Sequence, residues 1–216
     1  MIRLTHRVLC LAVLCGAVLI PGAARAQFGF IPVISSSGDG PDIDRTGLYL
    51  GLGAFGNAIV NQANSGVDFL TSGAGANFQL GIRLHPNFAL EFSLGESMHN
   101  DVTDAWGNTV DYLALNFVTV DAKFILPASG LPLRPYLQAG LGYYMLTDSW
   151  SSELASGGGF QLGGGLDFYL NSWWSVGGRL LYHGIQFSSV TFPQTGDSKT
   201  PFLSTVSLEA NVQIHF

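Results

Sequence analysis

The charged side chains that could do chemistry are few, and most of them stand in segments that alternate polar and apolar residues. Charged residues make up 11% of the 216 positions, against about 25% in an average soluble domain. Those in the alternating segments carry both signs and are Arg83, Glu91, Asp121, Lys123, Asp167, Arg179 and Glu209. Because burying an unpaired charge costs several kcal/mol, we expect them to pair in one buried network. That network either fixes strand register or gates an interior passage.

The histidines offer no catalytic pair in the sequence. His183 is followed by Gly184 and Ile185, and the next serines, Ser188 and Ser189, stand five and six residues further on. Five residues along a strand place two side chains on opposite faces, whereas a nucleophile and its base must lie within hydrogen-bond reach. We therefore predict no catalytic residue and no enzyme.

Residues 1–26 are predicted to be a cleaved secretory signal peptide. A basic start is followed by an apolar run over 8–20 and then by Ala24 and Ala26, the small residues expected before a cleavage site. The run is shorter than the roughly 20 residues of a membrane-spanning helix. Both cysteines precede the cut, so the exported chain has no disulfide and no cysteine ligand. No metal site or cofactor is predicted.

Strict alternation is the main structural signal after the signal peptide. Thr205–Phe216 sets six apolar residues against six polar ones without exception, which is typical of a strand with one apolar and one polar face. The pattern recurs in eight segments: 47–56, 76–84, 88–95, 112–126, 136–145, 158–170, 174–187 and 205–216. The segment 112–126 changes phase near Asn116, which predicts a β-bulge there.

The connections between these segments alternate in length. Short turns are predicted at 85–87 and 171–172 and a medium one at 127–135, with long loops at 57–73, 96–111, 146–157 and 188–201. Short turns at one end and long loops at the other, on an even number of strands, are typical of an outer-membrane barrel. The sequence thus predicts an all-β, eight-stranded antiparallel up-and-down transmembrane β-barrel over 46–216, after a flexible periplasmic leader at 27–45 rich in Ser, Gly and Asp.

Alternation alone does not say whether the polar face points outward or into the barrel, because a soluble barrel shows the same alternation with its apolar face inward. Here the polar faces carry mostly Gly, Ser, Asn and Gln rather than Lys and Glu, and aromatic residues gather near the strand ends. Both features favour apolar side chains facing lipid between two aromatic girdles. The formal net charge of −6 is opposite to a nucleic-acid-binding footprint, so no nucleic-acid partner is predicted.

The signal peptide, the eight strands and the final strand resemble the small outer-membrane barrels of the OmpA, OmpX and OmpW kind. The run 133–142 is similar to the R-P-Y-x-x-A-G-x-G strand opening of that group, and 165–170 resembles its G-x-D-Y-x-L hairpin. The resemblance implies a Gram-negative outer membrane, with lipid and lipopolysaccharide as surroundings. It also implies a terminal strand, with Val212, Ile214 and Phe216, that the barrel-assembly machinery reads as its insertion signal.

Some small outer-membrane barrels are lipid A deacylases with a His-x-Ser pair. This sequence departs from that pattern, because Ile185 stands where the serine is required. The predicted loops are acidic, Glu96 among them. These carboxylates are either simply solvated or bridge to lipopolysaccharide through divalent cations, which prefer oxygen ligands.

Two roles stay open for the barrel itself. An eight-stranded barrel is just wide enough to be filled by its own side chains, yet many positions on the polar face are glycine: Gly51, Gly53, Gly81, Gly140, Gly142, Gly163, Gly165 and Gly177. If glycine serves close packing, the protein has a structural or surface-interaction role. If glycine leaves a cavity, the protein is a narrow channel or carrier for small molecules, including apolar ones. The sequence does not set the oligomeric state.

Overall fold

The computed structural model describes residues 46–61, 71–103, 109–127, 132–148, 153–188, 190–191, 198–199 and 202–216. The predicted signal peptide at 1–26, its cleavage residues Ala24 and Ala26, and the predicted leader at 27–45 lie outside these residues and stay predictions. Within the described part of the chain there is no helix that could cross a membrane.

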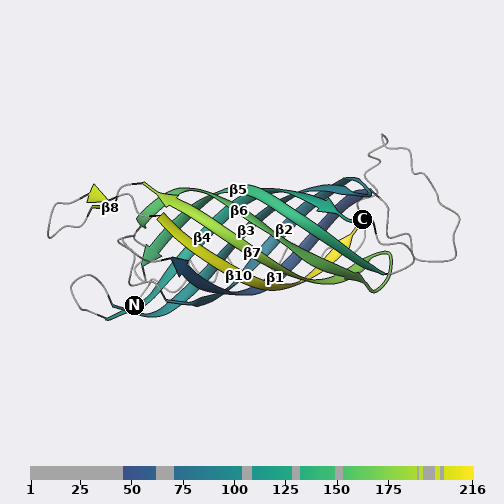
Figure 1. The fold of residues 1–216 in the computed structure, drawn as a ribbon. Helices are drawn as coiled ribbons and strands as arrows, with labels where there is room; N and C mark the ends of the chain where they lie inside the picture. Colours follow the sequence, from purple (N-terminus) through teal and green to yellow (C-terminus); the bar gives the residue numbers. More distant parts are fainter. Residues whose placement is uncertain are drawn as a thin grey trace, which may run out of the picture. The chain divides into compact units, whose positions relative to one another are not determined.

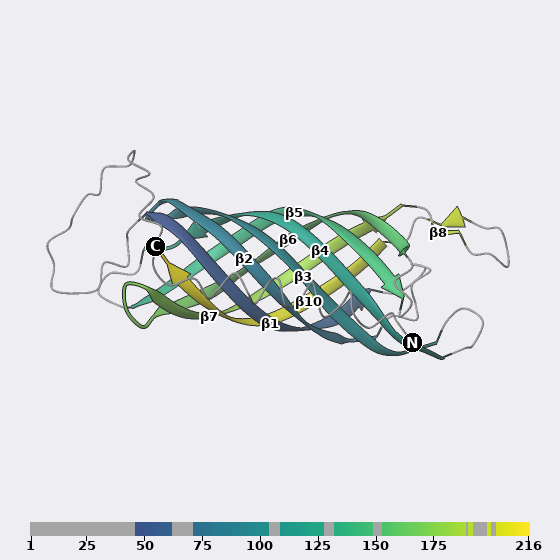
Figure 2. The same cartoon turned by 180° about the vertical axis from the view of Figure 1, so that it is seen from behind.

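Eight antiparallel strands close into a barrel, as the sequence predicts (Figure 1). Around the barrel they follow the order β1-β10-β7-β6-β5-β4-β3-β2, and the view from behind shows the same closure (Figure 2). The strands are β1 (Gly47–Asn61), β2 (Gly73–His85), β3 (Phe88–Thr103), β4 (Thr109–Ile125), β5 (Leu133–Asp148), β6 (Glu153–Tyr169), β7 (Trp174–Phe187) and β10 (Phe202–His215). A separate two-stranded sheet joins β8 (Val190–Thr191) and β9 (Ser198–Lys199).

The strands are tilted, because their pairing is staggered around the barrel. Following paired residues once around from Pro135 on β5 leads back to the same strand at Met145, and 145 − 135 is 10 residues. A closed barrel with such a stagger tilts its strands by roughly 35–45°. With a rise of about 3.3 Å per residue, each residue then climbs about 2.5 Å along the barrel axis.

The two ends of the barrel differ, and we name them for their connections. The turn end carries the C-terminus and the short connections 86–87, 126–132 and 170–173. The loop end carries the connections 62–72, 104–108, 149–152 and 188–201. The predicted short turns therefore share one end, as the up-and-down topology requires.

Over most of each strand, apolar side chains face outward and polar ones inward. On β10, Leu208 is 67% exposed whereas its neighbour Glu209 is 3% exposed. An exposed apolar wall around a polar interior is the reverse of a soluble barrel and suits a barrel that faces lipid.

The predicted β-bulge near Asn116 is wrong. β4 pairs with β3 and with β5 in continuous register through Asn116. What changes at Asn116 is which face of β4 is apolar. On the turn-end side of Asn116, the apolar Val118 and Val120 face outward. On the loop-end side, the apolar Leu115 and Leu113 are buried inside the barrel. The phase shift in the sequence therefore marks an inversion of the inside and the outside of the barrel wall.

The loops predicted at 96–111 and 146–157 are shorter than expected. Strands β3 and β4 leave only 104–108 between them, and β5 and β6 leave only 149–152. The same inversion explains the error, because the interior at the loop end is apolar and part of the outward positions there are polar. Gln186 is exposed between the buried Ile185 and Phe187, so the alternation continues with its sense reversed.

Candidate functional site

The barrel interior collects nearly all of the charged side chains that the structure describes. Nine charged residues have described side chains, and eight of them are buried. Four are basic and four acidic, so their formal charges cancel: Arg83, Lys123, Arg134, Arg179, Glu91, Asp121, Asp167 and Glu209. The seven residues singled out in the sequence are all among them. Arg134 was missed because its place at the start of a strand, in the R-P-Y motif, gave no sign that it faces inward.

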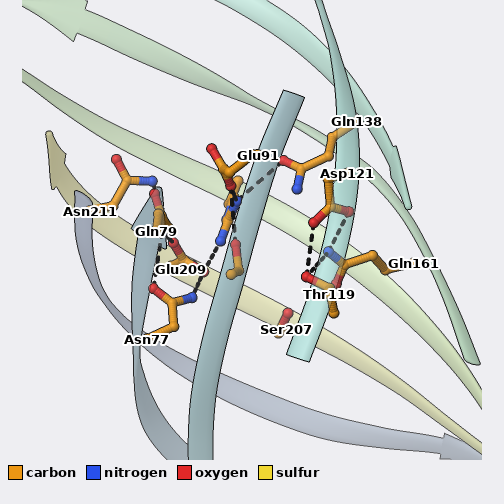
Figure 3. A network of polar contacts seen from close by, with 12 residues as sticks. Asn77, Gln79, Glu91, Thr119, Asp121, Gln138, Gln161, Ser207, Glu209 and Asn211 are labelled. Atoms are coloured by element: carbon orange, nitrogen blue, oxygen red, sulfur yellow. Dashed lines mark hydrogen bonds and ion pairs between the residues drawn. The ribbon is translucent and has the colours of Figure 1, made fainter. Parts of the chain in front are cut away.

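Glu91 on β3 holds the centre of this network (Figure 3). Its Oε1 accepts a hydrogen bond from Arg179 Nη1 at 2.6 Å, and its Oε2 lies 3.3 Å from Lys123 Nζ. Tyr49 donates its hydroxyl to the same Oε2 at 2.8 Å. Lys123 also lies 3.6 Å from Asp167 Oδ2. Residues distant in sequence on β3, β4, β6 and β7 are thereby joined across the interior.

A second branch runs from Arg179 to β10. Arg179 Nη2 lies 2.9 Å from Glu209 Oε2. The same carboxylate accepts hydrogen bonds from Asn77 Nδ2 and Gln79 Nε2, both at 2.6 Å (Figure 3). Asn211 Nδ2 also donates to it, at 3.4 Å. Since Glu209 is engaged by one cation and three amides, its charge is compensated without solvent.

Asp121 and Arg83 use other partners. Asp121 accepts hydrogen bonds from Thr119 Oγ1 at 2.9 Å and from Gln161 Nε2 at 2.5 Å (Figure 3). Arg83 donates from Nε and Nη2 to the carbonyl of Pro86 and from Nη1 to the hydroxyl of Tyr169. Through these contacts Arg83 fastens the β2–β3 turn to Tyr169 on β6, on the opposite wall of the barrel.

Glycines make room for aromatic rings beside the network. Tyr49 pairs across strands with Gly81, and Tyr136 pairs with Gly165. A Cβ placed on Gly81 would overlap the Tyr49 ring, and one on Gly165 would lie 2.6 Å from the Tyr136 hydroxyl oxygen. Lys123 Nζ lies 4.0 Å from the centre of the Tyr136 ring, within cation–π range. These glycines therefore serve packing rather than an open passage.

Aromatic rings fill the interior at the turn end. The His215 ring lies between Tyr169 and Tyr49, with centroid distances of 5.0 and 5.5 Å. Ser175 Oγ lies 2.8 Å from His215 Nε2. This layer covers the charged network on the side of the C-terminus.

An apolar cluster fills the interior at the loop end. Its buried members come from β4, β5, β6, β7 and β10: Leu113, Leu115, Tyr144, Leu146, Ala155, Ile185, Phe187 and Leu203. Ile59 and Phe117 pack against it. Along β4 the inward residues thus pass from charged to polar to apolar as the strand approaches the loop end.

A small cavity of about 20 Å³ lies between the charged network and the apolar cluster, room for about one water molecule. Beside it, His183 Nε2 lies 2.8 Å from Ser207 Oγ, and His183 Nδ1 lies 3.3 Å from the Tyr144 hydroxyl. Ser207 escaped the sequence reasoning because it stands on another strand, and strand register alone reveals it. The pair has nucleophile–base spacing, but both side chains are buried inside the barrel.

A family model described as "Outer membrane protein beta-barrel domain" matches residues 15–216. The chain belongs to this family of outer-membrane β-barrels. Within the family fold, the last strand carries Val212 and Phe216 exposed on its outer side, with Ile214 partly buried between them. Their part in insertion stays a prediction.

Solved outer-membrane barrels share the fold at low sequence identity. Neisserial surface protein A is 16% identical, with a TM-score of 0.54, and the match covers 78% of this chain and 97% of that one. OprG from Pseudomonas aeruginosa is 13% identical, with a TM-score of 0.55, and the match covers 81% of this chain and 99% of that one. No curated protein matches the sequence.

Proposed function

We propose that this protein is a non-conducting, non-enzymatic outer-membrane barrel with a structural or surface-interaction role. One observation carries the proposal: the described interior is filled from the turn end to the loop end. Aromatic rings, then a charge-balanced network, then an apolar cluster succeed one another along the axis. An interior of this kind is a core rather than a passage.

The alternative of a narrow channel or carrier needs space that the described residues fill. The cavity above the network holds about one water molecule, which is too little for an organic solute. The space beside glycines on the inner face is filled by neighbouring side chains. At Gly53, for example, an added Cβ would lie 2.6 Å from Glu209 Oε1.

We expect no catalysis because a substrate cannot reach the Ser207–His183 pair, although both groups are present. Ser207 and His183 are in contact, but the apolar cluster lies on one side of them and the charged network on the other. A lipid substrate outside the wall has no route to the serine. We therefore assign this pair to the hydrogen bonding of the interior.

The proposal is tested by solute uptake. Liposomes containing the purified protein are placed in small uncharged sugars, and swelling is followed by light scattering against protein-free liposomes and liposomes with a general porin. We expect the rate of the protein-free sample. Swelling that rises with the amount of protein would instead favour the channel.

A further inference from the structure

One charged side chain departs from the rule that charges face inward. Among the nine charged residues with described side chains, Glu96 on β3 is the exposed one. The sequence places it in a loop, but it lies within the strand, between the outward-facing Leu94 and Met98. Within the described residues it makes no hydrogen bond or ion pair. An ionisable residue on the lipid-facing wall calls for a partner.

The stagger of the barrel fixes the height of Glu96. The row of paired residues climbs ten residues over eight strand-to-strand steps, or 10/8 = 1.25 residues per step. Two steps lead from Glu96 through Asn116 to Met145. Two steps climb 2.5 residues, so Glu96 is level with the point between Gly142 and Tyr143 on β5.

This level lies near the loop end of the apolar band, two residues before the outward-facing Met98 on β3. Tyr143 is an outward aromatic residue, as expected at a membrane interface. Phe88, at the start of β3, lies eight residues before Glu96, or about 20 Å along the axis, close to the roughly 25 Å height of the apolar band of such barrels. Glu96 thus faces the headgroups at the loop end, which is the extracellular side in barrels of this kind.

A second oxygen ligand stands beside Glu96. Asn116 is its paired residue on β4, and Asn116 Nδ2 donates to Thr147 Oγ1 on β5 at 3.2 Å. Within the described residues the Asn116 Oδ1 accepts no hydrogen bond, so this oxygen is available as a ligand. A carboxylate and an amide oxygen on neighbouring strands are ligands that Mg²⁺ and Ca²⁺ prefer.

We propose that Glu96 and Asn116 form a lipid-facing site that holds a divalent cation shared with the phosphate of an anionic outer-leaflet lipid. Charge balance favours this occupant, because one carboxylate, one phosphate and one divalent cation sum to zero. The ammonium of a zwitterionic headgroup would leave one negative charge over in a poorly hydrated interface. The site is continuous with the wall that already faces lipid.

The test measures unfolding of the refolded protein in vesicles of phosphatidylcholine alone and with phosphatidylglycerol, each with millimolar Mg²⁺ or with EDTA. We expect Mg²⁺ to stabilise the wild type only in the phosphatidylglycerol vesicles. At a free concentration ten times the dissociation constant, the folded-to-unfolded ratio rises about elevenfold. Glu96→Gln is expected to lose this gain, and Asn116→Ala to reduce it.

A matched control separates the site from surface charge in general. Glu153→Gln removes another acid, at the loop end of β6, and is expected to keep the full Mg²⁺ effect. Retention of the effect by Glu96→Gln, or its loss in Glu153→Gln as well, would overturn the proposal. Stabilisation by phosphatidylethanolamine in EDTA would assign an ammonium partner and overturn it too.

Discussion

At the scale of single residues, the interior depends on carboxylates that are shared between strands. Glu91 is 1% exposed and accepts from Arg179, Lys123 and Tyr49. Glu91→Gln keeps the shape but removes the charge, which leaves two buried cations with less compensation. We expect a loss of about 3–5 kcal/mol in the free energy of unfolding, measured by urea unfolding in lipid vesicles.

Glu96→Gln in the absence of divalent cations is the control for this substitution. It makes the same chemical change on the same strand, but at an exposed position, and is expected to shift the free energy of unfolding by no more than about 0.5 kcal/mol. Equal effects of the two variants would mean that the network adds nothing to stability.

Glycine has a specific task where an aromatic ring lies over it. Gly81→Ala places a methyl group inside the ring of Tyr49, so Tyr49 must shift and lose its bond to Glu91. We expect a cost of about 1–3 kcal/mol, as for other overpacked sites. Gly158→Ala, where a Cβ meets nothing within 4 Å, should be nearly neutral. A neutral Gly81→Ala would show that the inner face has free space there.

At the scale of strands, polarity inverts part of the way along the wall. On β7, Val176, Leu180 and Tyr182 face outward, but nearer the loop end Ile185 and Phe187 are the buried apolar residues. Above the lipid the outer surface meets water, so the strands there need an apolar interior like that of a soluble protein. The barrel thus continues beyond the apolar band with a core of its own.

The sequence predicted the strands well and their environment less well. Period-two alternation located all eight strands, and for 174–187 both ends agree with β7. A β-bulge and an inversion of the apolar face from outside to inside produce the same phase change in the sequence at Asn116. Alternation cannot separate them, because it reports only which residues are apolar and not which side of the wall they face. Cross-strand partners such as Ser207 for His183, or Gly81 for Tyr49, depend on register, which a single sequence does not give.

The loop-end cluster should behave as a packed core. Ile185 is fully buried in it. We expect Ile185→Val to cost about 0.5–1.5 kcal/mol and Ile185→Ala about 2–5 kcal/mol, measured by urea unfolding in vesicles. If both variants unfold like the wild type, this part of the interior is not close-packed.

At the scale of the whole molecule, the loop end should face the cell exterior. Both natural cysteines lie in the predicted signal peptide, so single cysteines can report orientation in the exported chain. Gln186→Cys, exposed near the loop end, should react with an impermeant maleimide on intact cells, whereas His85→Cys at the turn end should react only after lysis. The reverse pattern would invert the orientation of the barrel.

The most direct test of a filled interior is ion conductance across a planar lipid bilayer. An interior closed by aromatic, charged and apolar layers offers ions no continuous water path, so the purified wild-type protein should insert and give no current steps above the bare membrane. Regular steps whose ion selectivity changes in Arg179→Gln or Glu209→Gln would contradict the account, because they would place a conducting path through the network itself.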